Sequence, residues 1–178
     1  MVSLVYKGIK VAHIVAVGKN GEIGANDKLL WHIPEDFKFF KSMTLGRVLL
    51  MGRKTVDSLP KPLPQRMVIC VSRNKHFKSQ NHMLHPLPLS VAVTNAHWHS
   101  ANLNSDTIFI AGGAQLYNST FDIVDELYVT HVDAEYPEAD TFYHVPEGFV
   151  KTGDVIPTTQ SVSGLKFRVS KYERLTTE

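Results

Sequence analysis

The sequence predicts an α/β fold, in which helices flank a sheet of mostly parallel strands. Short apolar runs recur at residues 11–18, 47–52, 66–72 and 107–113. Continuous runs of Val, Ile and Leu suit strands that are covered on both faces, as strands of a parallel sheet are. Segments with helical periodicity separate the runs, and they can supply the crossover connections that parallel strands need.

The intervening segments predict four helices, and the last third predicts strands of another kind. The helices are expected at residues 34–44, 53–59, 88–95 and 114–120. Residues 126–136 and 166–175 alternate between apolar and polar side chains, which is typical of strands with one exposed face. We expect these two segments to be long strands at the edge of the sheet, antiparallel to each other.

Length and composition indicate one globular domain. The chain has 178 residues, of which 43% are hydrophobic and 20% charged, and neither a linker nor a repeat divides it. We therefore expect a single domain over residues 10–178 after a short extension or tag remnant at residues 1–9. The net charge of +2 is spread without a basic run, so neither nucleic-acid nor membrane-surface binding is expected.

Cysteine content and hydropathy indicate a cytoplasmic protein. The single cysteine, Cys70, lies in an apolar run, so it cannot form an internal disulfide and is expected to be a buried small residue. A reducing compartment fits this cysteine usage. No apolar stretch reaches the length of about 18 residues that a membrane span needs, and the first ten residues lack the order of a signal peptide.

Residues 31–41, WHIPEDFKFFK, place one carboxylate, Asp36, on the apolar face of a predicted helix. At about 100° per residue, the apolar side chains that share its face are Ile33, Phe37, Phe39, Phe40 and Met43. The polar Glu35, Lys38 and Ser42 point the other way. A carboxylate on an apolar face either pairs with a cation or has a raised pKa, and both conditions mark functional sites. The segment alone also fits an acid that only stabilises the first helical turn.

Three strand ends carry groups that suit an anion. They are Gly52 with Arg53, Lys54 and Thr55; Ser72 with Arg73; and Gly112 with Gly113. Each group alone also fits a tight turn or a solvated helix start. Carboxyl ends of parallel strands meet at one edge, where ligands of open α/β sheets bind, so the three together indicate a pyrophosphate and a further phosphate monoester, as in an NADP-type cofactor. The GxGxxG motif of ordinary dinucleotide sites is absent.

A glycine-containing segment and a group of histidines also bear on function. Residues 18–31 contain three glycines and predict either a plain surface loop or a mobile lid that closes with Ile23, Leu29 and Trp31. Five histidines crowd one region: His76, His82, His85, His97 and His99. No cysteine or carboxylate set completes a metal site there, so a polar surface is expected and no metal.

Five motifs together resemble the dihydrofolate reductase family, in its order and approximate spacing, over about residues 11–175. They are IVAVGKNGEIG, WHIPEDFKFFK, LLMGRKTVDSLPKPLPQR, IAGGAQLY, and LYVTHVDAE followed by Asp140-Thr141-Phe142. The resemblance implies one domain with a central eight-stranded, mostly parallel sheet, flanking helices and an antiparallel C-terminal strand. It also implies NADPH-dependent reduction of 7,8-dihydrofolate to 5,6,7,8-tetrahydrofolate, which supplies one-carbon metabolism.

On the substrate side, the resemblance matches Asp36 to the family's active-site acid, which holds the 2-amino group and N3 of the pterin ring. Thr130 matches the hydroxyl that bonds this acid, and Trp31 completes the expected catalytic set. Arg66 matches the arginine that pairs with the α-carboxylate of the glutamate tail, a bidentate role that suits arginine. The other expected substrate-binding positions are Ile14, Val15, Leu29, Phe37, Phe40, Leu59, Leu63 and Ile110.

On the cofactor side, Ala16 and Ile23 match the backbone positions that hold the nicotinamide carboxamide. Arg53, Lys54, Thr55, Ser72 and Arg73 match the adenosine-phosphate side. The other expected positions are Gly24, Gly52, Ile110, Gly112, Gly113, Ala114, Gln115, Leu116 and Tyr117. The resemblance also implies a cis peptide bond between Gly112 and Gly113. The sequence departs from the family at two positions, since Leu30 and Val48 stand where the family often has proline. Neither change removes a catalytic group, so we expect them to affect the dynamics of the lid and not the activity.

The expected reaction transfers a hydride from C4 of NADPH to C6 of the pteridine, and solvent protonates N5. Asp36 orients and polarises the ring, because the 2-amino edge is too far from N5 for direct donation. Expected ligands are dihydrofolate and antifolate-like inhibitors, bound by a monomer. Two alternatives stay open. One is another pteridine or pyrimidine reductase of this fold, such as the riboflavin-pathway reductase, which would not need Arg66. The other is a non-catalytic nucleotide- or folate-binding module, which would not need Asp36, Thr130 and Trp31 together.

Overall fold

The structure, a computed structural model, describes residues 8–76 and 86–176, and it divides into two compact units. The first unit comprises residues 1–12 and 44–123, and the second comprises residues 13–43 and 124–178. The expected extension at residues 1–9 lies almost wholly outside the described residues, so the predicted division at residue 10 stays a prediction.

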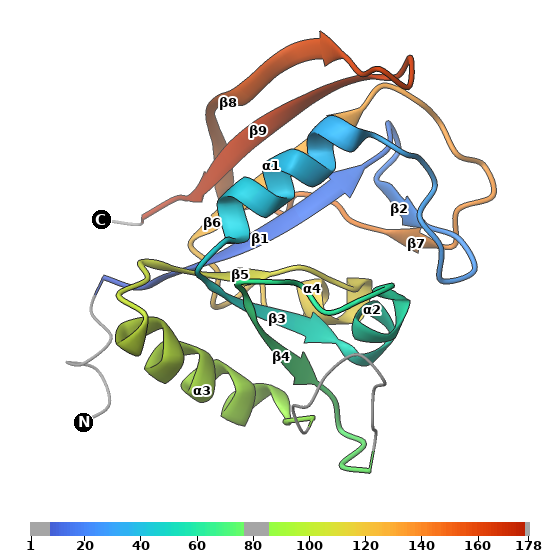
Figure 1. Cartoon of the computed structure of the whole chain (residues 1–178). Helices are drawn as coiled ribbons and strands as arrows, with labels where there is room; N and C mark the ends of the chain where they lie inside the picture. Colours follow the sequence, from blue (N-terminus) through green and yellow to red (C-terminus); the bar gives the residue numbers. More distant parts are fainter. Residues whose placement is uncertain (1–7, 77–85, 177–178) are drawn as a thin grey trace. The chain divides into compact units, whose positions relative to one another are not determined.

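The first unit contains three parallel strands in the order β4-β3-β5 (Figure 1). They are β3 (Val48–Gly52), β4 (Met67–Val71) and β5 (Thr107–Ile110). The first four residues of β3 are all 2% exposed or less, because β3 is paired on both sides and covered on its faces. The prediction of doubly covered parallel strands from solid apolar runs is confirmed here.

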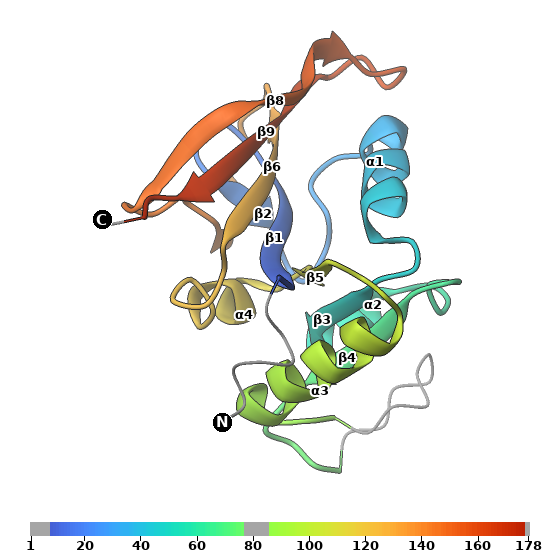
Figure 2. The same cartoon turned by 90° about the vertical axis from the view of Figure 1, so that its left-hand side faces the viewer.

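Three helices accompany these strands, and α3 lies alongside them in both views (Figures 1 and 2). Helix α3 (Leu89–Asn102) contacts all three strands, α2 (Arg53–Ser58) contacts β3 and β4, and α4 (Ala114–Asn118) contacts β3. Helix α3 runs well past the predicted end at residue 95, because the buried Ala96 and Ser100 continue its inner face through a segment that reads as polar.

The second unit contains three antiparallel strands in the order β6-β9-β8. They are β6 (Glu126–Val132), β9 (Lys166–Arg174) and β8 (Phe149–Gln160). The predicted antiparallel pairing of the segments that form β6 and β9 is confirmed. The prediction that they are edge strands is wrong, because β8 pairs with β9 and forms the edge. Strand β8 is exposed along most of its length, so its sequence lacks the apolar pattern that would have revealed it.

Strand β1 (Lys10–Val17) begins in the first unit and ends in the second. With it, the main sheet has seven strands within the described residues, in place of the eight expected. Beyond β4, Leu87 forms only an isolated parallel bridge to Val71, so no further strand follows in the described part of that segment. The C-terminal strand β9 is antiparallel, as expected.

Helix α1 (Pro34–Thr44) has the predicted bounds and belongs to the second unit. Proline suits its first position, and the carbonyl of Ile33 accepts the backbone N–H groups of Asp36 and Phe37. The same unit holds a short antiparallel pair that the sequence did not predict, β2 (Glu22–Gly24) with β7 (Thr141–Phe142). Both strands are too short to show a period.

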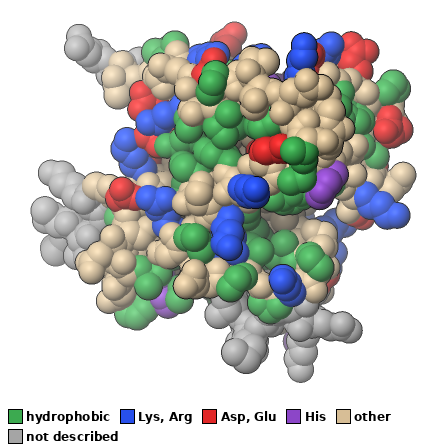
Figure 3. Space-filling view, turned by 45° about the horizontal axis from the view of Figure 1, so that its top comes forward, with side chains coloured by type: hydrophobic (Ala, Val, Ile, Leu, Met, Phe, Trp, Pro, Cys, Tyr) green, Lys and Arg blue, Asp and Glu red, His purple; other side chains and the backbone are tan. Residues whose placement is uncertain are grey.

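Basic and acidic side chains are intermixed on the face shown in Figure 3. Among the helices in residues 8–76 and 86–176, none is both long and apolar enough to cross a bilayer.

Candidate functional site

Asp36 lies in the first turn of α1, where a hydroxyl from β6 meets its carboxylate. Thr130, which is 3% exposed, donates its Oγ1 hydrogen to Oδ1 of Asp36 at 2.6 Å. Thr130 comes from the middle of β6, which is paired with β9 along its whole length. The acceptor is therefore held by a hydroxyl whose own position is set by the sheet.

Burial raises the pKa of Asp36 above its ordinary value, and the hydrogen bond from Thr130 lowers it by a smaller amount. No cation is among the causes of this shift. Of the two conditions that the sequence allowed, desolvation is the one that the structure shows. A desolvated carboxylate with one oxygen already bonded is suited to a ligand that brings further N–H donors.

The apolar face around Asp36 is formed in part as predicted. Ile33 and Phe39 are buried, and Phe40 and Met43 are half-buried. Phe37 departs from the prediction, because it is 49% exposed and its ring lies 5.7 Å from that of His32. At about 100° from Asp36, Phe37 sits at the margin of the face, where a slight rotation of the helix turns a side chain outward.

The segment at residues 18–31 forms a loop that is anchored by two carboxylates. Glu22 is 2% exposed and accepts the backbone N–H of Asn20 at 2.7 Å and that of Tyr136 at 3.1 Å. Burial opposes the ionisation of Glu22, but these hydrogen bonds outweigh it and the pKa is lowered. The side-chain amide of Asn20 also donates to Glu22, at 3.2 Å. No motif or periodicity in the sequence pointed to Glu22, because Tyr136 lies on a distant segment and the Asn20 contacts depend on the local turn.

The second anchor of this loop is Asp140. Its carboxylate accepts the backbone N–H of Asn26 at 2.9 Å, and its own N–H donates to the carbonyl of Gly24 at 3.0 Å. Trp31, at the end of the loop, lies 5.3 Å from the ring of Tyr136. Closure of this loop as a lid stays a prediction.

The remaining predicted positions of the second unit differ widely in exposure. Ile14 and Val15 on β1 are 7% and 8% exposed, and Ala16, Ile23 and Gly24 are half-buried. Leu29 is 65% exposed.

In the first unit, the three predicted anion-binding strand ends lie at one edge of the parallel sheet. Gly52 is paired in register with Val71, so β3 and β4 end level, and β5 ends at the same edge with Ile110 opposite Leu50. The N–H of Gly52 also donates to the carbonyl of Gly112 at 2.8 Å, which joins two of the ends directly. The expectation drawn from parallel strands is confirmed.

The Gly112–Gly113 turn is closely surrounded, and its peptide bond is cis, as the resemblance implied. Gly112 has φ of +109°, and a Cβ atom there would lie 3.4 Å from Oγ1 of Thr55 and 3.5 Å from the hydroxyl of Tyr117. Glycine is required at this position by its backbone conformation. The backbone of this turn is therefore closely approached by the hydroxyls of Thr55 and Tyr117.

Cationic and hydroxyl side chains follow the other two strand ends. Arg53 and Lys54 begin α2 and are exposed, and Arg73 is exposed after β4. Ser72 accepts the backbone N–H of Asn74 at 3.1 Å. Together with the glycine turn, these groups form an edge that can receive a phosphorylated ligand.

The other predicted positions of the first unit are as follows. Leu59, Leu63 and Arg66 are half-buried, Ile110, Leu116 and Tyr117 are buried, Ala114 is half-buried and Gln115 is exposed. The Nε of Arg66 donates to the carbonyl of Pro64 at 3.0 Å, and burial lowers the pKa of its guanidinium. Its Nη1 also donates to Oγ1 of Thr44, at 3.5 Å.

Some side chains of the described residues are of the types that could bind a metal ion or act as a thiol nucleophile. Within residues 8–76 and 86–176, no three His, Cys, Asp or Glu side chains are grouped to hold a metal ion. His97 bonds the carbonyl of Val93 at 2.9 Å, and His82 and His85 lie outside the described residues. Burial raises the pKa of Cys70 to about 11, so its thiolate is disfavoured.

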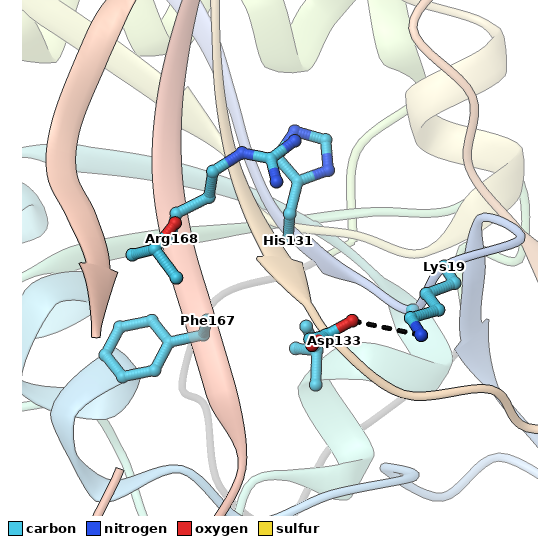
Figure 4. Close-up of a pocket in the computed structure, with 8 residues that line it drawn as sticks. Lys19, His131, Asp133, Phe167 and Arg168 are labelled. Atoms are coloured by element: carbon cyan, nitrogen blue, oxygen red, sulfur yellow. Dashed lines mark ion pairs between the residues drawn. The ribbon is translucent and has the colours of Figure 1, made fainter. Parts of the chain in front are cut away.

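The second unit also holds a cavity of about 340 Å³, which is lined by the start of the loop at residues 18–31 and by residues of β6, β8 and β9 (Figure 4). Lys19 and Asp133 form an ion pair at 3.1 Å on its wall, and His131 lies beside Arg168. Burial, together with the charge of Arg168, lowers the pKa of His131 to about 4, so it is neutral at pH 7. Neighbouring residues of a strand face opposite sides, so His131 points away from the side on which Thr130 bonds Asp36.

The chain therefore combines an α/β fold with a desolvated acid in one unit and, in the other, strand ends that carry cations, hydroxyls and a glycine turn. The family described as dihydrofolate reductase matches residues 10–174. A dihydrofolate reductase of Buchnera aphidicola is 34% identical over 142 residues, which are 78% of this chain and 82% of that protein. One of Neisseria meningitidis is 38% identical over 76% of this chain and 79% of its own length.

A further relative, dihydrofolate reductase type 9 of Escherichia coli, is 39% identical over 67% of this chain and 68% of its own length. The chain belongs to the dihydrofolate reductase family and is an oxidoreductase.

Substitution of Gly112 by alanine tests the glycine turn. Because φ is +109° there, we expect Gly112→Ala to lower the free energy of unfolding by about 1–3 kcal/mol in urea denaturation. Gly153→Ala is the matched control, since its Cβ would meet nothing within 4 Å and its φ is not positive. Equal stability of the two variants would contradict the conformational argument.

Substitution of Thr130 tests the balance that sets the pKa of Asp36. Thr130→Val removes the hydroxyl that lowers this pKa, so the pKa should rise further above its ordinary value. Thr130→Ser keeps the donor and should leave the pKa close to that of the parent chain. The measurement is the carbon-13 NMR titration of the Asp36 carboxyl, and an unchanged pKa in the valine variant would rule out the hydroxyl's role.

Proposed function

We propose that this chain catalyses the NADPH-dependent reduction of 7,8-dihydrofolate to 5,6,7,8-tetrahydrofolate. Membership of the dihydrofolate reductase family supports this reaction. The observation that carries the choice of substrate is the desolvated carboxylate of Asp36, bonded by Thr130. A pterin ring has its 2-amino group and N3 side by side, and two adjacent nitrogens match the two oxygens of one carboxylate.

Asp36 is proposed to orient and polarise the pterin ring. Its raised pKa means that the folded chain disfavours a bare carboxylate, so charge-assisted hydrogen bonds from the ring compensate a penalty that is already present. N5 is several bonds from the 2-amino edge, so its proton comes from solvent rather than from Asp36. Trp31 and the loop at residues 18–31 are proposed to limit access of water.

The cofactor is proposed to be NADPH, which supplies the hydride from C4 of its nicotinamide. The strand-end edge of the first unit fits this group, because a glycine turn, hydroxyls and cations gather there. Arg53, Lys54, Ser72 and Arg73 would hold the adenosine-side phosphates, and the Gly112–Gly113 turn the pyrophosphate. The nicotinamide carboxamide is assigned to backbone at Ala16 and Ile23.

The substrate's glutamate tail is proposed to pair with Arg66, beside the apolar Leu59 and Leu63. An arginine in this role favours a folate over a ribosyl-phosphate substrate, which would need a different anion site. Inhibition by antifolates, a monomeric state and a cytoplasmic location stay predictions that accompany this function.

The test of the substrate assignment is NADPH oxidation, followed at 340 nm with and without dihydrofolate. Asp36→Asn should lower kcat/KM for dihydrofolate roughly 10²–10³-fold, as loss of an oriented charge does, and leave the Kd of NADPH nearly unchanged. An equal loss of NADPH affinity would remove Asp36 from the substrate side. Absence of dihydrofolate-dependent oxidation by the parent chain would overturn the proposed function.

The same variant separates activity from stability. The folded pKa of Asp36 is raised, so its ionisation opposes folding above that pKa. At pH 7, the free energy of unfolding of Asp36→Asn should therefore be higher than that of the parent chain. The difference should vanish below the ordinary pKa of an aspartate. Loss of activity with this gain excludes misfolding as the cause.

The test of the cofactor assignment is the ratio of kcat/KM with NADPH to that with NADH. Arg73→Gln should lower this ratio roughly tenfold or more, because it removes one charge-assisted hydrogen bond to the extra phosphate. Lys75→Gln, which removes an exposed cation two residues away, should leave the ratio unchanged. Equal ratios in both variants would show that Arg73 does not select NADPH.

A further inference from the structure

We infer that Glu35 is a positioning residue for Asp36, acting through the turn that joins β8 to β9. This inference rests on the proposed function, because it concerns how the substrate-binding acid is held. The sequence pattern only predicts that Glu35 points away from the apolar face of α1. The structure shows that the carboxylate of Glu35 is hydrogen-bonded to the β8–β9 turn.

Both oxygens of Glu35 accept hydrogen bonds from the β8–β9 turn. Ser161, which is 4% exposed, donates its hydroxyl to Oε2 at 2.6 Å, and the backbone N–H of Val162 donates to Oε1 at 2.8 Å. In both views, this turn lies beside the first turn of α1 (Figures 1 and 2). These bonds, first that from Ser161 and then that from Val162, lower the pKa of Glu35, so it is ionised at pH 7.

The turn that receives Glu35 is itself well determined. The hydroxyl oxygen of Ser161 accepts the backbone N–H of Ser163 at 3.1 Å and its hydroxyl at 3.0 Å. Ser161 also bonds Gly164 and Leu165 through its backbone, at 2.9 and 2.7 Å. Glu35 is thus attached to an ordered turn rather than to a free loop end.

Two consecutive acids therefore bind the first turn of α1 to two places in the second unit. Asp36 bonds Thr130 on β6, and Glu35 bonds the turn after β8, while β9 pairs with both of these strands. Neighbouring side chains on a helix diverge by about 100°, so the two anchors restrain different rotations of the helix. Loss of Glu35 would keep the bond from Thr130 to Asp36 but would detach the first turn of α1 from the β8–β9 turn.

The competing explanation is that Glu35 stabilises α1 only through its charge near the helix N-terminus. The variants Glu35→Ala and Glu35→Gln separate the two. Glutamine loses the charge, but its oxygen can accept from Val162. Its amide can donate to Ser161 in place of the Ser163 hydroxyl, which rotates away because the Ser161 oxygen has two acceptor sites. Positioning predicts that glutamine restores function, whereas a charge effect predicts that glutamine behaves like alanine.

The experiment measures kcat and KM for dihydrofolate, the Kd of NADPH, and the pH profile of kcat/KM. Glu35→Ala and Ser161→Ala should each lower kcat/KM roughly tenfold, mainly through KM, because a misplaced orienting group loses substrate alignment. In Glu35→Ala, the apparent pKa of Asp36 should fall toward its ordinary value as water reaches it. Glu35→Gln should recover most of the loss. Glu147→Ala, which removes an exposed acid of the same unit, is the control.

A Glu35→Ala variant with parental KM and pH profile would overturn the inference, whatever its melting temperature, and so would a glutamine variant as impaired as alanine. If the parent chain does not reduce dihydrofolate, the proposed function fails instead. The carbon-13 titration of the Asp36 carboxyl then decides the inference alone: a lowered pKa in Glu35→Ala, but not in Glu35→Gln, supports positioning, and an unchanged pKa in both refutes it.

Discussion

Withdrawal of the Asp36 carboxylate from water is the constraint around which the second unit is arranged. Burial disfavours its charge, and the hydroxyl of Thr130 compensates only part of that penalty. A carboxylate in this condition lowers the stability of the fold at neutral pH, because the unfolded chain returns it to water. Helix α1 brings the acid in, β6 supplies the hydroxyl, and Glu35 attaches the same helical turn to the β8–β9 turn.

The elements that follow from local pattern could be predicted from the sequence. The apolar run at residues 47–52 predicted a covered strand, and Val48, Leu49, Leu50 and Met51 are indeed buried. Pro34 marked the start of α1. Strand β8 could not be predicted, since an edge strand exposed along most of its length shows neither a solid apolar run nor a clean alternation. The polar end of α3 was missed for a related reason, because its inner face is made of Ala96 and Ser100.

Some residues of the candidate site could likewise be predicted from local pattern, and others could not. The position of Asp36 on an apolar face came from helical spacing, and the shared edge of the strand ends came from parallel topology. Thr130 came only from family resemblance, because it lies 94 residues from its partner. Glu22 and Glu35 could not be predicted from local pattern. Glu22 bonds Asn20 and the distant backbone N–H of Tyr136, and Glu35 bonds Ser161 and Val162, which lie 126 and 127 residues away. Such hydrogen bonds form only in the tertiary structure, so they produce no periodic pattern in the sequence.

The irregularity of β8 also bears on self-association. A long edge strand is a template for pairing with another chain, and proteins blunt such edges with lysine, proline and bulges. Strand β8 has all three: Lys151, Pro157 and three shifts of register against β9. Its outer row of N–H and C=O groups is therefore interrupted, and a second copy of the chain would find few consecutive partners there. The features that hid this strand from prediction also protect the sheet from aggregation.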